Sequence, residues 1–194
     1  MSTFFAPDRY ETPDFTIRCY QPGDGQMSQD SVNTSYEHLR TFMPWAKPDF
    51  SLEELEANAR RFCGEYLSNQ EFALGIFLPD GTRKLGGTGF HLRGQPVENL
   101  NAEVGMWIRA SEAGKGLGTR VLNHMLHWGF TAWPWVRLEW RCDTLNLASA
   151  AVARKAGMRL EGTLRQDERR SDGTRRDTYV FAILRDEYLQ DTSP

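Results

Sequence analysis

The chain has 194 residues, which suits one domain with a full hydrophobic core. Its formal net charge is −3, so it lacks the concentrated basic charge that nucleic-acid binding needs. No apolar run approaches the roughly 18–20 residues of a membrane helix, and the N-terminus has neither the basic nor the apolar region of a signal peptide. We therefore expect a cytoplasmic protein that binds neither nucleic acid nor a membrane.

The residue types that usually bind metals do not form a metal-binding pattern. Cys19, Cys63 and Cys142 are widely spaced and odd in number, without a CxxC pair, which indicates reduced, buried thiols. His124 and His127 are three residues apart on an expected helix but have no carboxylate or cysteine beside them, so a solvated helix face is favoured. No metal is expected.

The first part of the chain is predicted to contain one strand and two helices. Ser51 is a suitable N-cap and Glu54 follows three residues later, which is the pattern of a capping box. Two prolines bracket Trp45 in the preceding segment, 43-MPWAKP-48, which favours an exposed loop. The predicted elements are a strand at 15–22 and helices at 26–42 and 52–67.

The remainder alternates strands with shorter helices. Apolar residues recur at helical spacing from Val121 to Phe130, and Gly157 follows a short helical stretch. The order of elements predicts an α/β (α+β) domain with a mixed sheet, occupying the whole chain, 1–194, as one domain. The predicted strands are 71–79, 84–92, 102–109, 136–142, 158–166 and 176–184, and the short helix is 149–156.

A glycine cluster, 113-AGKGLGT-119, lies between the strand at 102–109 and the apolar helix. It is not a P-loop, because Lys115 is followed by Gly116, and it does not fit the GxGxxG dinucleotide pattern. Glycines let several amide N–H groups converge on one anion, and a helix N-terminus adds partial positive charge. The cluster suits a pyrophosphate, with a tight strand-to-helix turn that binds nothing as the alternative.

A second motif, 146-NLASAAVARKAGM-158, makes the chain resemble the GCN5-related N-acetyltransferase (GNAT) superfamily. Asn146 and Ser149 fall at the spacing of its later motif, as do Gly157 and Met158. Gly116 and Gly118 match the two glycines of its pyrophosphate loop. Ala113 departs from the pattern, because Gln or Arg is common there, which removes one side-chain contact without affecting the backbone.

Further phrases narrow the resemblance to the RimJ/RimL branch, whose known members acetylate the N-termini of ribosomal proteins. It covers about 14–188 and rests on 43-MPW-45, 102-AEVGMWI-108, 114-GKGLGT-119, 157-GMRLEGTLR-165 and 185-RDEY-188. It implies the GNAT fold: a mixed, mostly antiparallel sheet of six to seven strands, splayed in the middle and flanked by about four helices. It also implies acetyl-coenzyme A as cosubstrate, and a homodimer is possible.

The resemblance places the cosubstrate in the splay between the strands at 102–108 and 136–142. Backbone N–H groups there would bind the pantetheine arm and the thioester oxygen, as an oxyanion site requires. Asn146 would offer its amide to the pantetheine arm, cap the helix, or both. The expected cofactor-binding residues are Met106, Trp107, Ile108, Ala113, Gly114, Lys115, Gly116, Leu117, Gly118, Thr119 and Asn146.

Acetyl transfer to an amine needs a proton donor for the thiolate and a base for the amine. Many members of the superfamily carry a tyrosine donor where this chain has Ala153, so Ser149 is the candidate donor, with an ordinary helix serine as the alternative. Glu103 is the candidate base, with a solvated strand-end carboxylate as the alternative. His38 and His91 look isolated, although either could serve as a base on the acceptor side.

The acceptor is the least determined part of the prediction. Trp45 is a candidate acceptor contact, and the mixed-charge loop 165–177 would border the acceptor cleft, whereas Trp133, Trp135 and Trp140 are expected to pack in the core. The leading hypothesis is acetylation of a protein N-terminal α-amine. The alternatives are acetylation of a small amine (a polyamine, amino sugar, amino acid or antibiotic) and a non-catalytic acyl-coenzyme A sensor.

Overall fold

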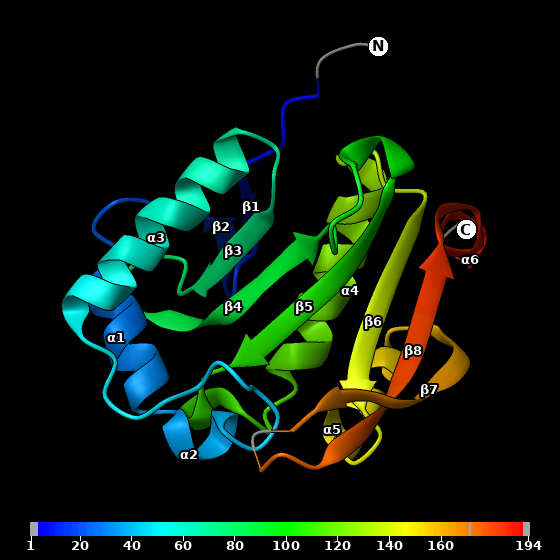
Figure 1. Ribbon diagram of the computed structural model, residues 1–194. Coiled ribbons are helices and arrows are strands. Elements are labelled where there is room, and N and C mark those ends of the chain that lie inside the picture. The colour runs from blue at the N-terminus through cyan, green and yellow to red at the C-terminus, as the bar shows by residue number, and fades with distance from the viewer. Residues whose placement is uncertain (1–3, 171, 192–194) are drawn as a thin grey trace.

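The computed structural model describes residues 4–170 and 172–191 and is built on one sheet in the order β1-β2-β3-β4-β5-β6-β8-β7 (Figure 1). Every neighbouring pair is antiparallel except β5 and β6, which are parallel. The strands are β1 (Arg9–Glu11), β2 (Thr16–Cys19), β3 (Phe72–Phe77), β4 (Lys84–His91), β5 (Asn101–Ile108), β6 (Arg137–Asp143), β7 (Arg159–Arg169) and β8 (Arg175–Leu184).

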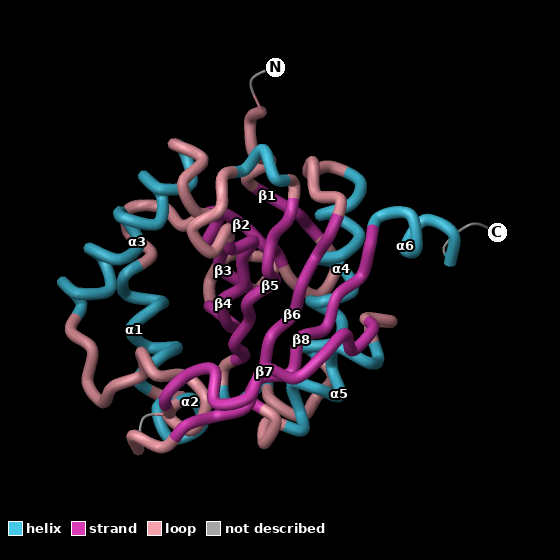
Figure 2. Tube along the Cα trace, turned by 45° about the vertical axis from the view of Figure 1, so that its right-hand side comes forward, coloured by secondary structure: helices cyan, strands magenta, loops and turns pink. Residues whose placement is uncertain are grey.

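Helices cover both faces of this sheet. The helices α1 and α3 pack on one face, and α4 and α5 pack on the other (Figures 1 and 2). Single 3₁₀ turns at Val97–Asn99 and Ala110–Glu112 flank β5. The α-helices are α1 (Gly25–Asn33), α2 (Tyr36–Leu39), α3 (Leu52–Leu67), α4 (Leu117–Thr131), α5 (Leu147–Lys155) and α6 (Arg185–Asp191).

The predicted class of fold is confirmed, but the predicted numbers of elements are too low. The described residues form eight strands and six α-helices. The strand at Arg9–Glu11 has only three residues and no apolar alternation, so the pattern of residues does not predict it. The helix expected at 26–42 is divided at Thr34 and Ser35, where Ser35 has a non-helical φ of −112°, and the buried Ser35 hydroxyl accepts a hydrogen bond from the Ala110 amide. Within the predicted loop 165–177, Ser171 lies outside the described residues.

The main core lies between the sheet and α4 and is rich in aromatic side chains. Trp133 and Trp135 stack with ring centroids 5.8 Å apart, and Trp140 is also buried, as predicted. Gly129 allows α4 to approach the sheet, because a Cβ there would lie 2.8 Å from Leu138 Cδ1. This packing fixes α4, and therefore the glycine cluster at its N-terminus, against β5.

The sheet is splayed between its two central strands, as predicted. The parallel ladder joins only Asn101–Glu103 of β5 to Arg137–Glu139 of β6. Beyond it, β5 pairs only with β4 and β6 pairs only with β8. The edge of β5 from Val104 to Ile108 therefore keeps backbone groups without a strand partner on the β6 side.

Candidate functional site

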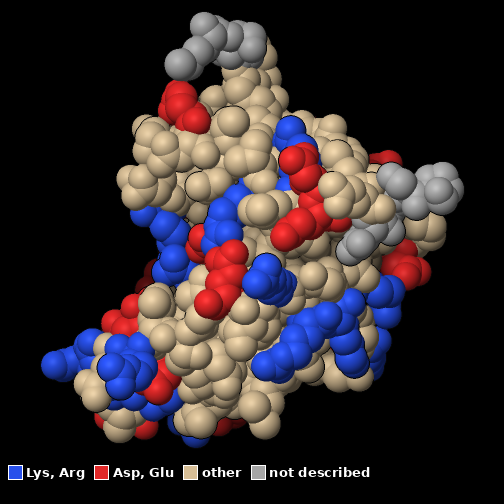
Figure 3. Space-filling model, turned by 90° about the vertical axis from the view of Figure 1, so that its right-hand side faces the viewer, with Lys and Arg blue, Asp and Glu red and all other residues tan. Residues whose placement is uncertain are grey.

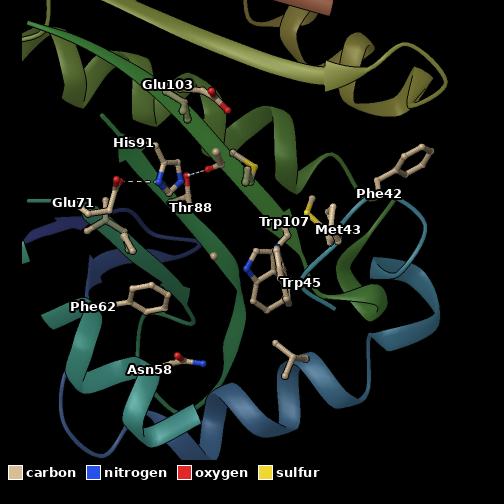
Figure 4. A pocket seen from close by; sticks show the side chains of 18 of the residues that line it. Phe42, Met43, Trp45, Asn58, Phe62, Glu71, Thr88, His91, Glu103 and Trp107 are labelled. Atoms are coloured by element: carbon tan, nitrogen blue, oxygen red, sulfur yellow. Dashed lines mark hydrogen bonds and ion pairs between the residues drawn. The ribbon is translucent and has the colours of Figure 1, made fainter. Parts of the chain in front are cut away.

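A cavity of about 750 Å³ lies between the sheet and the helices α1 and α3 and extends to the splay. Figure 4 shows its wall, with side chains from β4, β5, α3 and the loop that contains Trp45. Six residues of the predicted site come together in this lining: Trp45, Glu103, Met106, Trp107, Asn146 and Ser149. Charged side chains of both signs cover the neighbouring face over β7 and β8 (Figure 3).

Glycines on β4 and β5 make room for two large side chains on the cavity side of the sheet. Gly87 lies opposite Trp107 in the ladder, and a Cβ on Gly87 would overlap the indole ring. A Cβ on Gly105 would lie 2.5 Å from His91 Nε2. The two strands therefore present a flat floor with an imidazole at one end and an indole at the other.

Aromatic side chains stand above this floor. The Trp45 ring contacts the Trp107 ring edge to face, with centroids 5.9 Å apart, and Trp45 is 45% exposed. Phe62 of α3 lines the same cavity (Figure 4). The exposed edge of Trp45 suits a contact with an incoming acceptor, which stays a prediction.

His91 is not isolated, although it looks so in the sequence. Its Nδ1 atom lies 2.8 Å from Oε1 of Glu71, the residue immediately before β3 (Figure 4). Twenty residues separate the two in the chain, and the antiparallel pairing of β3 with β4 brings them together. Only the register of the two strands could have revealed this pair.

Glu103, the predicted base, lies in the cavity wall but is held in an ion pair. Its two carboxylate oxygens accept hydrogen bonds from Arg93 Nε at 2.8 Å and Nη2 at 2.5 Å. Arg141 Nε lies 3.6 Å away, and the Glu103 side chain is only 6% exposed. Hydrogen bonding to Glu103 raises the pKa of Arg93. Each oxygen of Glu103 therefore already accepts a hydrogen bond from Arg93, so the carboxylate is held in place as the partner of this arginine.

The glycine cluster forms the turn into α4 as predicted. Gly114 and Gly116 have φ of 75° and 78°, the left-handed region that favours glycine. Gly116 is the N-cap of α4, and no side chain caps the helix there. Lys115 Nζ lies 3.3 Å from Glu112, so its charge is already partnered. The free N–H groups of the first turn are thus available to an anion.

Gly118 connects this turn to the splay. A Cβ on Gly118 would lie 3.7 Å from Val152, 3.8 Å from Ile108 and 3.9 Å from Met106 Sδ. These are ordinary contacts, so an alanine would fit, whereas a larger side chain would extend between β5, α4 and α5. The turn and the unpaired edge of β5 therefore form one continuous surface.

Asn146 and Ser149 lie on the other side of the splay, where β6 leads into α5. Asn146 Oδ1 accepts a hydrogen bond from the Ser149 amide at 3.1 Å, so the predicted cap role is confirmed. Ser149 Oγ accepts a hydrogen bond from Trp140 Nε1 at 3.0 Å. Because the indole is only a donor, the hydroxyl proton of Ser149 is directed elsewhere, and the hydroxyl also hydrogen-bonds the Cys142 side chain.

Lys84 is a cavity residue that the sequence did not single out. Its Nζ donates to Ser28 Oγ at 3.0 Å and lies 4.4 Å and 5.2 Å from the ring centroids of Tyr20 and Trp107. Burial lowers its pKa from 10.5 to about 7. An irregularity in the β3–β4 ladder pairs Lys84 with Phe77 and so turns it to this face, which sequence alternation cannot show.

Among residues 4–170 and 172–191, no group of three or more His, Cys, Asp and Glu side chains is placed to hold a metal ion. His124 Nδ1 instead lies 3.1 Å from the Tyr10 hydroxyl, and His127 Nδ1 lies 3.4 Å from that of Tyr188. In the same described part of the chain, no helix combines the length and apolar character needed to cross a membrane.

Comparison with known proteins identifies the family of this chain. Residues 15–159 match the acetyltransferase (GNAT) domain. A curated relative, the uncharacterized N-acetyltransferase p20 of Bacillus licheniformis, is 28% identical over 122 residues, which are 63% of this chain and 67% of that protein.

Solved structures of acetyltransferases have the same fold. RimL, a ribosomal L7/L12 α-N-protein acetyltransferase in complex with coenzyme A, superposes with a TM-score of 0.79 at 22% identity, over 89% of this chain and 95% of that one. The microcin C7 self-immunity acetyltransferase MccE, in complex with acetyl-CoA and AMP, also gives a TM-score of 0.79, at 19% identity over 89% and 93% of the two chains. The fold implied by the sequence resemblance is therefore confirmed.

Proposed function

The chain belongs to the acetyltransferase (GNAT) family, and on that premise we propose that it transfers an acetyl group from acetyl-coenzyme A to a primary amine. The observation that carries this proposal is the splay, where the unpaired edge of β5 meets the uncapped N-terminus of α4. This surface fits a long, thin cosubstrate with a pyrophosphate at one end and a thioester at the other.

The residues predicted to bind acetyl-coenzyme A have suitable positions. The pyrophosphate would bind the amides from Ala113 to Thr119, where the left-handed glycines turn the backbone toward the start of α4. The pantetheine arm would follow the β5 backbone from Met106 to Ile108, with Asn146 across the splay. Acetyl-coenzyme A supplies the thioester; the backbone N–H groups of β5 polarise its carbonyl.

For the acceptor we favour a protein N-terminal α-amine, as the RimJ/RimL resemblance suggests. RimL shares the fold, and the cavity is open beside the exposed edge of Trp45. A small-molecule amine is the second candidate. It is favoured by the aromatic lining of Trp45, Phe62 and Trp107, which suits a compact ligand.

We assign Ser149 to the coenzyme A sulfur, to which its hydroxyl would donate as the thiolate leaves, in place of its hydrogen bond to Cys142. The base role predicted for Glu103 is less well supported, because Arg93 binds both of its oxygens. We assign Glu103 instead to holding Arg93 in the cavity wall. The predicted homodimer and cytoplasmic location stay predictions.

A thiol-release assay tests the proposal. Purified protein is incubated with acetyl-coenzyme A and, separately, with N-terminal peptides, the same peptides with a blocked α-amine, and a panel of polyamines, amino sugars and amino acids. Turnover with a free but not a blocked peptide supports the first acceptor class, and turnover with one small amine alone supports the second. Binding of acetyl-coenzyme A with no acetylated product from any amine would contradict the proposed function.

A further inference from the structure

His91 and Glu71 form a hydrogen-bonded pair on the cavity side of the sheet, next to the strand edge where the splay begins. We propose that His91, oriented by Glu71, is the base that takes a proton from the acceptor amine. This inference rests on the proposed acetyl transfer. It assigns to an imidazole the role that the sequence suggested for the carboxylate of Glu103.

The hydrogen bond to Glu71 fixes the state of the imidazole ring. An ionised carboxylate only accepts hydrogen bonds, so Nδ1 of His91 must carry the proton that is shared with Glu71 at 2.8 Å. In the neutral ring Nε2 is then the basic atom. Nε2 makes no hydrogen bond to any residue in 4–170 or 172–191, so its lone pair is free.

The free nitrogen lies close to where the thioester is expected. A Cβ on Gly105 would be 2.5 Å from His91 Nε2, so the absence of a side chain at Gly105 is what lets the ring reach over β5. Gly105 precedes Met106, on the stretch of β5 that no longer pairs with β6. A base at this point faces an amine that approaches the β5 edge from the cavity.

Glu103 lies directly opposite His91 in the β4–β5 ladder, but its environment is different. Arg93 binds both carboxylate oxygens of Glu103, whereas Glu71 leaves one nitrogen of His91 free. Other charged groups from the neighbouring elements line the same cavity: Arg61 and Glu65 of α3, Lys84 of β4, Arg141 of β6, Glu168 of β7 and Arg176 of β8.

The reaction balances with one base and one donor. His91 Nε2 takes one proton from the acceptor ammonium, which leaves a neutral amine and an imidazolium paired with Glu71. The amine nitrogen forms a bond to the thioester carbonyl carbon and the carbon–sulfur bond breaks. The nitrogen then loses a second proton, which Ser149 relays to the departing sulfur. The third proton stays on the nitrogen in the amide product. His91 then releases its proton to water.

The test is the pH dependence of kcat/KM with the best acceptor from the thiol-release panel. In His91→Asn, whose amide can still donate to Glu71, kcat should fall about 100-fold or more at pH 7, the usual contribution of a general base. KM for acetyl-coenzyme A should be unchanged, and the acid side of the profile should shift to higher pH, because the acceptor ammonium must then lose its proton to water. Glu103→Gln should keep the acid side of the wild-type profile. Added imidazole should restore activity to His91→Ala.

The matched control is His38→Asn, which changes an exposed histidine on α2 outside the cavity and should behave as wild type. If His91→Asn keeps the wild-type profile, or if Glu103→Gln shows the shift of the acid side instead, the base assignment is wrong while the acetyltransferase proposal stands. If wild type acetylates no acceptor, the proposed function fails and the base assignment fails with it. A nitrogen-15 NMR spectrum showing His91 protonated on Nε2 rather than Nδ1 would also overturn the assignment, independently of activity.

Discussion

Ser149 illustrates a single residue with two separable roles. Its hydroxyl oxygen accepts a hydrogen bond from the Trp140 indole, and the same hydroxyl hydrogen-bonds Cys142 in the cavity wall. In Ser149→Ala the buried indole N–H loses its partner, which should lower the free energy of unfolding by about 1–3 kcal/mol. If the hydroxyl also protonates the leaving thiolate, kcat should fall about tenfold or more with KM for acetyl-coenzyme A unchanged. Steady-state kinetics and urea unfolding measure the two effects separately.

A conservative substitution distinguishes a catalytic role of Ser149 from a structural one. Ser149→Thr keeps the hydroxyl and should recover most of kcat. A loss of stability in Ser149→Ala without any change in kcat would remove Ser149 from the mechanism and leave it as the partner of Trp140.

At the scale of an element, the turn into α4 depends on glycine for its backbone and for the space beside it. Gly116 has φ of 78° at the N-cap, where a β-branched residue is strained. In Gly116→Val the first-turn amides should shift away from a common anion, and the Kd for acetyl-coenzyme A should rise about tenfold or more. Isothermal titration calorimetry with acetyl-coenzyme A measures it directly.

Gly81 provides a matched control for the same substitution. It has φ of 72°, no atom within 4 Å of an added Cβ, and a position in the β3–β4 turn away from the splay. Gly81→Val should carry similar backbone strain but bind acetyl-coenzyme A as wild type does. If the Gly116 and Gly81 variants bind acetyl-coenzyme A with equal affinity, the glycine cluster is a strand-to-helix turn that binds nothing.

The same elements show what a sequence can and cannot predict. The glycine turn, the strand before it and the Asn146 cap depend on neighbouring residues, so local spacing predicted them. The pair His91–Glu71 and the position of Lys84 depend on strand register and on a ladder irregularity, which local patterns do not encode. The prediction of Glu103 as base rests on its place in the strand that the resemblance assigns to the cosubstrate, and nothing in the sequence shows that Arg93 binds this carboxylate.

At the scale of the whole molecule, the buried charge of Lys84 in the cavity makes the free energy of unfolding depend on pH. Burial lowers its pKa from 10.5 to about 7, so the folded chain holds this proton less tightly than the unfolded chain. The loss of stability caused by burying this charge is fully present below pH 7 and becomes smaller as the pH rises toward 10.5. The free energy of unfolding should therefore increase between pH 7 and 8.5, with a slope of up to about 1.4 kcal/mol per pH unit from this one group. Above that range Cys19 opposes the trend, because burial raises the pKa of its thiol to about 12.

Lys84→Met tests this account, because methionine fills similar space without a charge. Urea unfolding at pH 6.5 should show the variant more stable by about 1–4 kcal/mol, the usual range when apolar residues replace buried charges. The increase in stability from pH 7 to 8.5 should become smaller by the contribution of Lys84. A variant with the wild-type slope would show that Lys84 is not the group responsible. Lys84 lies against the Trp107 ring of the cavity. If Lys84→Met is more stable but has a raised KM for the acceptor, the charge of Lys84 contributes to acceptor binding while it lowers the stability of the fold.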